Sequence, residues 1–192
     1  MNARSTLRPV IVSVPEADQR PKGREQVAVL SRLARLALLR SAEASGLAID
    51  SFPKDAAGVP LPVMGVYWSV THKPSMVAGV AAVEPVGIDL ERVRPVSEAV
   101  MAKVAGADEW ALVDEERQRG FFRIWTAKEA VLKAVGKGMA GLSRCRLVSI
   151  LDSTRLVLAY DQTHWPVAQC WFRDHLAAVA AQQSAVAWTT IE

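Results

Sequence analysis

Two carboxylates at the end of an apolar run constrain this chain more than any other feature. The residues from 76 onward are mostly apolar and lead into Val-Gly-Ile-Asp-Leu-Glu at 86–91. Because side chains alternate between the two faces of a strand, this segment sends its aliphatic residues into a core and projects Asp89 and Glu91 from the opposite side. Paired carboxylates suit Mg²⁺, which prefers hard oxygen ligands. A solvated strand edge is the alternative interpretation of the same pattern.

A second segment carries another acidic residue. Residues 118–135 have the spacing of a helix that stops at Gly136. Glu129 and Lys133 are four residues apart, so they project from one face of this helix. They form either an ordinary surface ion pair or, beside the strand carboxylates, a third carboxylate and an ammonium at one metal site. The choice depends on whether the fold brings the strand and the helix together.

The composition limits the classes of function. With 192 residues, 51% of them hydrophobic, the chain is large enough to bury a core. A net charge of +3 fits an anionic small ligand or an acidic protein partner and is too small for a nucleic-acid-binding surface. Two separated cysteines indicate a reduced protein. With no signal peptide and no apolar run long enough to span a membrane, we expect a cytoplasmic protein without nucleic-acid or membrane partners.

The remaining patterns predict an α+β chain. Helices are expected over 24–44, 97–104 and 108–117. A polar loop is expected over 16–23. Strands are expected at 9–14, 49–52, 66–70, 76–82, 146–151, 155–160, 167–172, 176–181 and 185–190.

An internal echo predicts a duplicated architecture. Residues 76–82 (Met-Val-Ala-Gly-Val-Ala-Ala) resemble residues 175–181 (His-Leu-Ala-Ala-Val-Ala-Ala), and each segment follows a long helix. We therefore expect two pseudo-symmetric lobes, an N-terminal lobe at 1–85 and a C-terminal lobe at 86–192. Each lobe would pack a long helix on a small, mostly antiparallel sheet.

Basic residues gather at the start of the first long helix. Arg20, Lys22 and Arg24 lie where the free backbone N–H groups of a helix N-terminus already favour an anion. These three are the candidates for a phosphate contact. The other arginines of the helix are expected on a solvated face.

Both motifs together resemble the signature of a known family. Val-Gly-Ile-Asp-Leu-Glu (86–91) is followed about forty residues later by Trp-Thr-Ala-Lys-Glu-Ala-x-x-Lys-Ala-x-Gly-x-Gly (125–138). This pair is similar to the paired signature of the 4′-phosphopantetheinyl transferases. The long segment before residue 86 resembles the larger, two-lobed branch that includes the activator of surfactin synthetase. The resemblance implies an active site in the cleft between the two lobes.

The resemblance also implies a reaction. The 4′-phosphopantetheine arm of coenzyme A would move to a serine of an apo acyl or peptidyl carrier protein, releasing 3′,5′-ADP. Asp89, Glu91 and Glu129 would hold Mg²⁺ or Mn²⁺, and Glu129 and Lys133 would be catalytic. By the same resemblance the enzyme would be a monomer, since its two lobes form a pseudo-dimer.

Coenzyme A contacts follow from the same resemblance. Ser69-Val70-Thr71-His72 is similar to the family's Ser-x-Ser-His segment, which assigns His72 to the 3′-phosphate. The resemblance adds Thr71, Lys73 and Lys128 as coenzyme A contacts, whereas Arg20, Lys22 and Arg24 are candidates only by their position at the start of the helix. In Gly58-Val59-Pro60, however, Val59 stands where the family has a lysine.

Two other functions fit the same residues. One is a protein that binds coenzyme A or a carrier protein without transfer, which the missing lysine would favour. The other is a metal-dependent phosphodiesterase that uses Asp89, Glu91 and Glu129, although the modest charge disfavours a nucleic-acid substrate.

Overall fold

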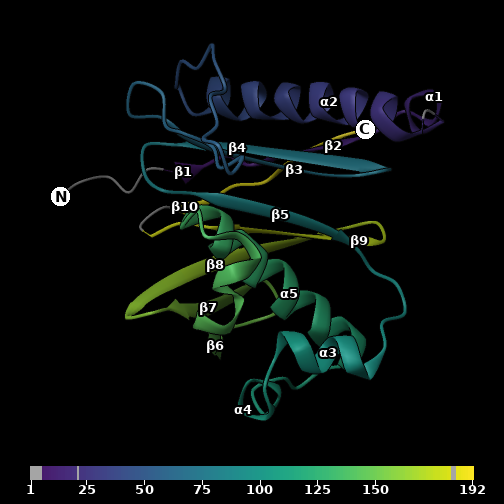
Figure 1. Cartoon of the computed structure of the whole chain (residues 1–192), viewed down its shortest axis with the longest axis vertical. Coiled ribbons are helices and arrows are strands. Elements are labelled where there is room, and N and C mark those ends of the chain that lie inside the picture. Colours follow the sequence, from purple (N-terminus) through teal and green to yellow (C-terminus); the bar gives the residue numbers. More distant parts are fainter. Residues whose placement is uncertain (1–5, 21, 183–184) are drawn as a thin grey trace.

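Two β-sheets lie face to face between two long helices. The computed structural model describes residues 6–20, 22–182 and 185–192. Helix α2 (Gly23–Ala44) covers the outer face of the first sheet, and helix α5 (Arg117–Ala134) covers the outer face of the second. Figure 1 shows α2 at the top, over the first sheet, and α5 in the lower half, below β5 and beside β7 and β8. The fold is therefore mixed α+β, as the sequence predicts.

The first sheet is built mainly from the first half of the chain. Its order is β11 (Thr189–Ile191), β2 (Val10–Ser13), β4 (Met76–Ala82) and β3 (Tyr67–Lys73). β4 pairs antiparallel with β2 and β3, whereas β11 adds in parallel to β2. A Cβ atom on Gly79 of β4 would lie 2.5 Å from the backbone nitrogen of Leu38, so a glycine is needed where α2 approaches the sheet.

The second sheet is entirely antiparallel. Its order is β5 (Gly87–Arg92), β9 (His175–Ala180), β8 (Thr163–Phe172), β7 (Arg155–Tyr160) and β6 (Cys145–Ile150). Helix α5 packs on β5, where a Cβ on Gly87 would lie 2.0 Å from the carbonyl oxygen of Ala130. The glycine thus brings α5 close to the strand that carries Asp89 and Glu91.

The inner faces of the sheets share one apolar core. Aliphatic residues of β4, β5 and β9 alternate toward it, among them Val80, Ile88 and Val179, which are almost completely buried. This burial explains the long apolar runs in the sequence, because these strands are covered on both faces. The core fixes β5 between the two halves of the molecule.

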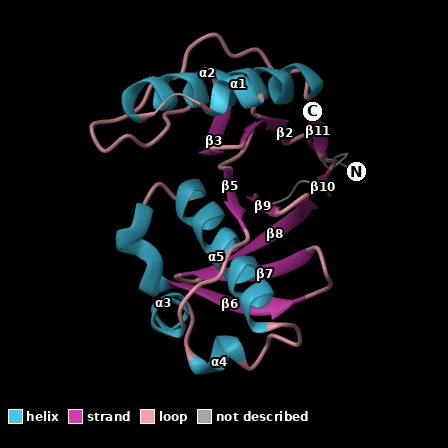
Figure 2. Cartoon of the chain, turned by 90° about the vertical axis from the view of Figure 1, so that its right-hand side faces the viewer, coloured by secondary structure: helices cyan, strands magenta, loops and turns pink. Residues whose placement is uncertain are grey.

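Short elements complete the chain. They are β1 (Thr6–Leu7), α1 (Glu16–Gln19), α3 (Glu98–Val104), α4 (Ala107–Trp110), the 3₁₀ helix η1 (Gly138–Arg144) and β10 (Ala185–Val186). β10 pairs in parallel with β1, so the end of the chain returns to strands of the N-terminal half. Figure 2 shows α3 and α4 at the end of the molecule opposite α2. No helix in the described ranges is long and apolar enough to cross a membrane.

Four sequence expectations about local structure need correction. The predicted loop at 16–23 contains α1, and the predicted strand at 49–52 is irregular chain. The predicted helix at 108–117 ends at Trp110. The next helix, α5, begins at Arg117, because Glu116 caps it by accepting hydrogen bonds from the backbone N–H groups of Gln118 and Arg119. The predicted strand at 185–190 is divided into β10 and β11.

Helix α5 ends before Gly136, where the sequence predicts its end. Gly136 has a φ of +66°, the left-handed conformation that glycine adopts at least cost. Its N–H donates to the carbonyl of Lys133, and the N–H of Lys137 donates to that of Leu132. This Schellman motif stops the helix directly after the turn that carries Lys133.

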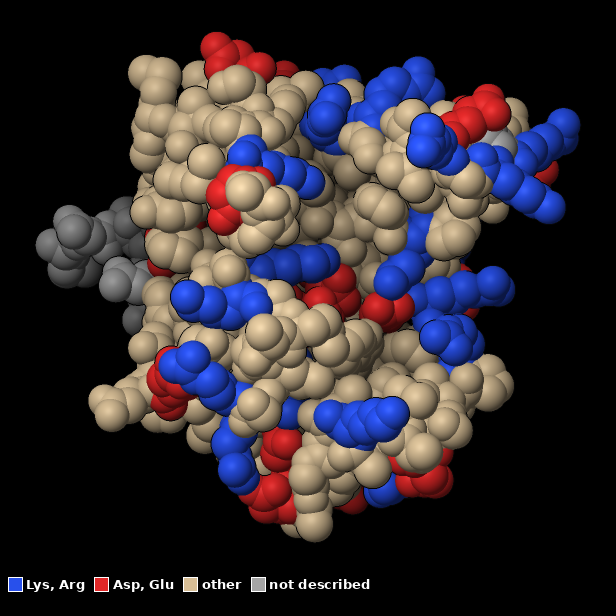
Figure 3. All heavy atoms as spheres, viewed as in Figure 1, with Lys and Arg blue, Asp and Glu red and all other residues tan. Residues whose placement is uncertain are grey.

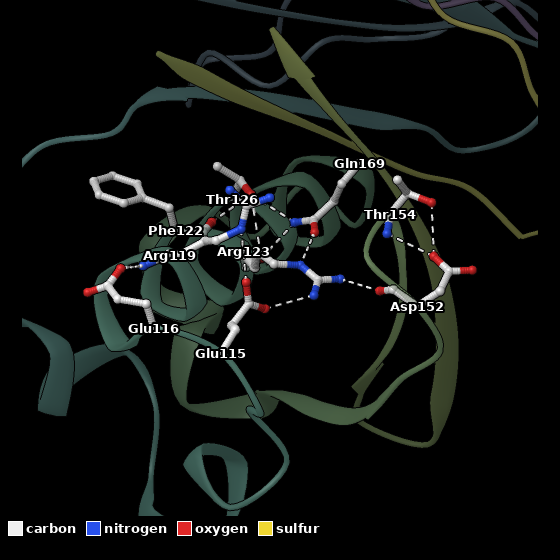
Figure 4. Close-up of polar contacts among 9 residues, drawn as sticks. All are labelled: Glu115, Glu116, Arg119, Phe122, Arg123, Thr126, Asp152, Thr154 and Gln169. Atoms are coloured by element: carbon white, nitrogen blue, oxygen red, sulfur yellow. Dashed lines mark hydrogen bonds and ion pairs between the residues drawn. The ribbon is translucent and has the colours of Figure 1, made fainter. Parts of the chain in front are cut away.

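A buried arginine anchors the first half of α5. The Arg123 guanidinium donates to Gln169 Oε1 (2.9 Å), Glu115 Oε1 (2.8 Å) and the carbonyl oxygen of Asp152 (2.7 Å). Gln169 in turn donates to the carbonyl oxygen of Arg123 and to Thr126 Oγ1. Figure 4 shows these contacts joining α5 to β8, to the β6–β7 turn and to the segment before the helix. The network fixes the position of the helix that carries Glu129.

Candidate active site

A cavity of about 680 Å³ lies between the two halves of the molecule. It is lined by α2 and the loop after it, by β3 and β5, and by α5. Figure 3 shows acidic side chains in the hollow between the halves, with lysine and arginine side chains around them. The sequence-predicted residues that line it are Thr71, His72, Lys73, Asp89, Glu91, Glu129 and Lys133.

Strands β3 and β5 lie side by side at this cavity and are joined by alternating side chains of β3. Ser69 Oγ accepts a hydrogen bond from the backbone N–H of Ile88, at 3.1 Å. Thr71 Oγ1 donates to Asp89 Oδ1 at 3.2 Å. The two strands come from different sheets, so these contacts align the Ser-x-Thr-His segment with the Asp-x-Glu segment.

Asp89 is the most buried carboxylate of the cavity, with 4% of its surface exposed. Its Oδ1 atom also accepts a hydrogen bond from Lys133 Nζ, at 2.7 Å. Its other oxygen, Oδ2, is buried and has no hydrogen-bond partner among the described residues. Since a buried carboxylate oxygen without a partner is costly, this atom is available to a ligand.

Glu91 is held from two directions. Lys73 Nζ donates to Glu91 Oε1 at 2.9 Å, and Trp125 Nε1 donates to the same oxygen at 3.0 Å. Trp125 belongs to α5, so the indole ties the helix to β5. The tryptophan of the second motif therefore orients a carboxylate of the first.

Glu129 faces the same cavity from α5. Burial raises the pKa of its carboxyl group, and the negative charges of Asp89 and Glu91 raise it further against the lowering effect of Lys133. Its Oε1 atom is buried and has no hydrogen-bond partner in the described chain. The helix thus adds a third carboxylate to the two on β5.

The three carboxylates supply oxygen ligands, the kind that a divalent cation such as Mg²⁺ prefers. In the described ranges, no group of three or more acidic, histidine or cysteine side chains is arranged around a common point for a metal ion. Asp89 and Glu91 instead pair with the ammonium groups of Lys133 and Lys73. The unpartnered oxygens of Asp89 and Glu129, together with the repulsion that raises the Glu129 pKa, are what a bound Mg²⁺ would relieve.

His72 lies at the rim of the cavity with its side chain accessible. Partial desolvation of the ring by the cavity walls lowers its pKa, and the positive charges of Lys133, Lys73 and Lys54 lower it further. The imidazole is thus surrounded by cations, a setting that attracts an anionic ligand.

Four residues of the predicted coenzyme A set lie elsewhere. Lys128 is buried and donates to Glu109 and to the carbonyl oxygen of Val104, on the side of α5 that faces α3 and α4. Successive helix residues project about 100° apart, so Lys128 cannot share the direction of Glu129. The other three are Arg20, Lys22 and Arg24, and none of them lines the cavity.

Sequence reasoning missed several lining residues. Arg35 of α2 was expected on a solvated face, and Lys54 lies in a loop without a motif. Phe52 and Trp68 meet edge to face with ring centroids 5.5 Å apart, and both line the cavity beside these cations. No spacing rule in the sequence points to these residues, because their approach to the cavity depends on how α2, β3 and the loop between them pack together.

Comparison with known proteins places these motifs in a family. A model of the 4′-phosphopantetheinyl transferase superfamily matches residues 85–187. The chain is similar to 4′-phosphopantetheinyl transferase psf-1 of Bacillus pumilus, with 38% identity over 82 residues, 40% of this chain and 35% of that protein.

Two further relatives carry the same description. The gsp protein of Aneurinibacillus migulanus is 29% identical over 92 residues, 46% of this chain and 39% of that protein. HetI of Nostoc sp. (strain PCC 7120 / SAG 25.82 / UTEX 2576) is 36% identical over 90 residues, 43% of this chain and 38% of that protein. The similarity to these three proteins thus spans less than half of their lengths.

The family match includes both motifs, the Asp-x-Glu segment on β5 and the Trp-Thr-Ala-Lys-Glu segment on α5. It covers more than half of the chain, and the chain therefore belongs to the 4′-phosphopantetheinyl transferase superfamily.

Proposed function

We propose that this protein transfers the 4′-phosphopantetheine arm of coenzyme A to a serine hydroxyl of an apo acyl or peptidyl carrier protein. The observation that carries the proposal is the shared cavity, in which three carboxylates and two lysines from β3, β5 and α5 face one space. Such a mixture of acidic and basic groups suits a diphosphate bound with a divalent cation.

The proposed reaction is a phosphoryl transfer in which the chain's carboxylates would hold a divalent cation beside the diphosphate. The serine oxygen forms a bond to the β-phosphorus of coenzyme A, and the bond from that phosphorus to the bridging oxygen breaks, releasing 3′,5′-ADP. Asp89, Glu91 and Glu129 would hold Mg²⁺ or Mn²⁺, and the bound ion supplies positive charge to the diphosphate oxygens. Positioning and charge stabilisation account for most of the acceleration in this class of reaction.

Lys133 and Lys73 provide the chain's own positive charge. Both ammonium groups line the cavity and lie within hydrogen-bond distance of the carboxylates. An ammonium has three N–H donors, so each lysine can donate to a phosphate oxygen while it keeps its hydrogen bond to the carboxylate. Lys133 is assigned to the departing phosphate.

Glu129 is the proposed proton acceptor for the serine hydroxyl. Its Oε1 atom has no hydrogen-bond partner among the described residues, so it can accept the proton without giving up a hydrogen bond within the chain. General-base assistance of this kind contributes roughly 10²–10⁴-fold in rate. His72 is assigned to the 3′-phosphate of coenzyme A, on the cation-rich side of the cavity.

We also propose the two-lobe organisation, with lobes at 1–85 and 86–192 and the active site in the cleft between them. The order of elements supports it: in each sheet one inner strand, β4 or β9, pairs with a strand that precedes the long helix and with its own hairpin partner. The echo segments 76–82 and 175–181 correspond to these two central strands. Monomeric state and cytoplasmic location remain predictions.

Incubation with coenzyme A, Mg²⁺ and an apo carrier protein tests the proposal. We expect the intact mass of the carrier to rise by one phosphopantetheine group, at its acceptor serine only. Coenzyme A retained by the protein without a mass gain would indicate a binding protein. Neither binding nor mass gain, with hydrolysis of a model phosphodiester, would indicate a phosphodiesterase.

A further inference from the structure

A serine, a histidine and an aspartate meet where the two halves of the molecule join, outside the cavity. Ser75 lies in the turn between β3 and β4. Asp174 lies in the turn between β8 and β9, and His175 is the first residue of β9. None of the three lines the cavity. The fold thus brings a hydroxyl, an imidazole and a carboxylate together from opposite ends of the chain.

The three side chains are arranged in series. Ser75 Oγ lies 3.1 Å from His175 Nε2, and the two atoms share a hydrogen bond. On the other side of the ring, Nδ1 lies 2.7 Å from Asp174 Oδ1. This buried Nδ1 atom has no other partner among the described residues. These contacts assign the proton of the neutral ring to Nδ1, which leaves Nε2 to accept the proton of the serine.

The imidazole is in the state that a base requires. His175 is 1% exposed, and burial lowers its pKa more than the charge of Asp174 raises it. The ring is therefore neutral at neutral pH, where Nε2 carries a lone pair. The carboxylate that faces it is fixed, because Arg92 Nε donates to Asp174 Oδ2 at 2.6 Å and the backbone N–H of Val93 donates to the Asp174 carbonyl oxygen at 2.8 Å.

The serine is accessible from solvent. Ser75 is half-buried, and Pro74 before it is exposed. The side chain of Asp174 is 50% exposed. The backbone of the turn is held, since the Ser75 carbonyl oxygen accepts a hydrogen bond from the N–H of Val14 at 2.9 Å. A small electrophile can therefore approach the hydroxyl while the base behind it stays covered.

We propose that Ser75, His175 and Asp174 form a nucleophilic site, separate from the carboxylate cavity, at which small activated carboxylic esters acylate Ser75. Serine, histidine and aspartate in this order of contacts recur on unrelated folds, and geometry rather than sequence position identifies them. The inference goes beyond the proposed function and does not depend on it.

The acylation step follows from the contacts. Ser75 Oγ forms a bond to the carbonyl carbon of the ester while its proton moves to His175 Nε2. The bond between that carbon and the ester oxygen then breaks, and Nε2 returns the proton to the departing alcohol. Asp174 is a positioning residue, which orients the ring and compensates its positive charge while it holds the proton.

Labelling with a fluorophosphonate tests the site, because a nucleophilic serine oxygen bonds to its phosphorus and displaces fluoride. We expect one label per chain, which peptide mass mapping places on Ser75. 4-Nitrophenyl acetate should leave an acetyl group on the same residue. Ser75→Ala should abolish both modifications. His175→Gln should slow labelling by at least about 10²-fold, the lower end of what a general base contributes.

Asp174 is tested by a pair of variants. Asp174→Asn should slow the labelling of Ser75, and Asp174→Glu, which keeps the charge, should restore part of the rate. A role of Asp174 in stability alone would not separate these two variants in labelling rate. Ser51→Ala, at an exposed loop position, is the control and should be labelled as the wild type is.

Circular dichroism shows whether each variant is folded, and if His175→Gln is not, the two Asp174 variants decide. An unlabelled Ser75 in the wild type would overturn the site and leave the serine–histidine bond as a structural link between the halves. Labels spread over several serines at similar rates would overturn it too, as would a folded His175→Gln that is labelled at the wild-type rate. Transfer of phosphopantetheine is measured separately, so its presence or absence leaves this result unchanged.

Discussion

Each carboxylate of the site has a different environment, and the differences assign their roles. Asp89 is held by Lys133 and Thr71, and Glu91 by Lys73 and Trp125. The buried oxygen of Glu129 has no hydrogen-bond partner in the described chain. Hydrogen bonds therefore fix the positions of Asp89 and Glu91 before any ligand binds, whereas Glu129 Oε1 can take up a proton or contact a ligand without losing a hydrogen bond.

Replacing Asp89 tests this assignment at the level of one residue. Asp89→Asn keeps the shape of the side chain and removes its charge, so we expect transfer to fall by at least ~10²-fold, the scale for one lost charge-stabilising group. Intact-mass analysis of the carrier measures the rate, and circular dichroism monitors the fold. Asp50→Asn, at an exposed loop position, is the control. Near-normal transfer by Asp89→Asn would exclude the carboxylate site.

Residue patterns predict the three carboxylates and Lys133, but not the lining cations Arg35 and Lys54. The Asp-x-Glu alternation and the four-residue spacing of Glu129 and Lys133 follow from strand and helix geometry, which is local. Arg35 lines the cavity because of the way α2 packs on its sheet, and Lys54 because of the path of the loop after α2, and no local rule describes either. Lys128 is next to Glu129 in sequence, yet helix geometry turns it toward Glu109, where it forms a buried ion pair at 2.7 Å.

At the level of elements, glycines set the distance between each helix and its sheet. Gly79 of β4 contacts the backbone of α2, and Gly87 of β5 contacts the backbone of α5. The sequence predicts both helices and most strands because their apolar periods are long. It does not predict these contacts, because a glycine in a strand is found equally at a bulge, at a tight bend or where another backbone comes close.

Adding one methyl group at Gly87 tests the helix–strand contact. The Cβ of Gly87→Ala would lie 2.0 Å from Ala130 O and 2.5 Å from Ala134 N, so α5 must move away from β5. We expect the free energy of unfolding to fall by about 3 kcal/mol, at the upper end of overpacking costs. Urea denaturation measures it.

Gly106→Ala is the control for this change, because its new methyl group would meet only the movable side-chain oxygen of Asp108. A small loss in Gly106→Ala and a large one in Gly87→Ala would support the account. Equal stability of Gly87→Ala and the wild type would show that α5 does not require this close approach.

The Arg123 network gives a second test at this level. Arg123→Met removes the donor to the buried Gln169 Oε1 and to the carbonyl oxygen of Asp152, and leaves Glu115 with Arg119 alone, so we expect a loss of about 3 kcal/mol in unfolding free energy. Arg155→Met breaks an ion pair with Asp152 in which the arginine side chain is 65% exposed, and it should cost less than about 1 kcal/mol. Comparable losses in the two variants would contradict a structural role for the network.

For the whole molecule, the two halves are joined by contacts of β5 with β3 and β4, by the pairing of β11 with β2 and by a buried histidine at the start of β9. Ser75, directly before β4, shares a hydrogen bond with His175 Nε2 at 3.1 Å. His175 is 1% exposed, and its Nδ1 atom lies 2.7 Å from Asp174 Oδ1. Burial lowers the pKa of His175, and this effect exceeds the opposing effect of Asp174.

This lowered pKa predicts a pH dependence of stability. Below the unfolded-state pKa of about 6.5, the unfolded chain binds a proton at His175 that the folded chain does not, so the free energy of unfolding decreases as the pH falls. Urea denaturation at pH 7.5 and pH 5.5 should show this decrease, and His175→Gln should reduce it. His72 contributes in the same direction, so part of the decrease should persist.

His164→Gln, at an exposed position on β8, is the control for loss of a histidine. An unchanged pH dependence in His175→Gln would show that the buried histidine does not titrate between the folded and unfolded states.

The most direct test of the account is a crystal structure with coenzyme A and Mn²⁺, in which anomalous scattering locates the metal ion. We predict one Mn²⁺ ion contacted by Asp89, Glu91 and Glu129, with the diphosphate of coenzyme A beside it in the cavity lined by α2, β3, β5 and α5. A metal ion or a diphosphate bound elsewhere, with Asp89 and Glu91 still paired to Lys133 and Lys73, would contradict it.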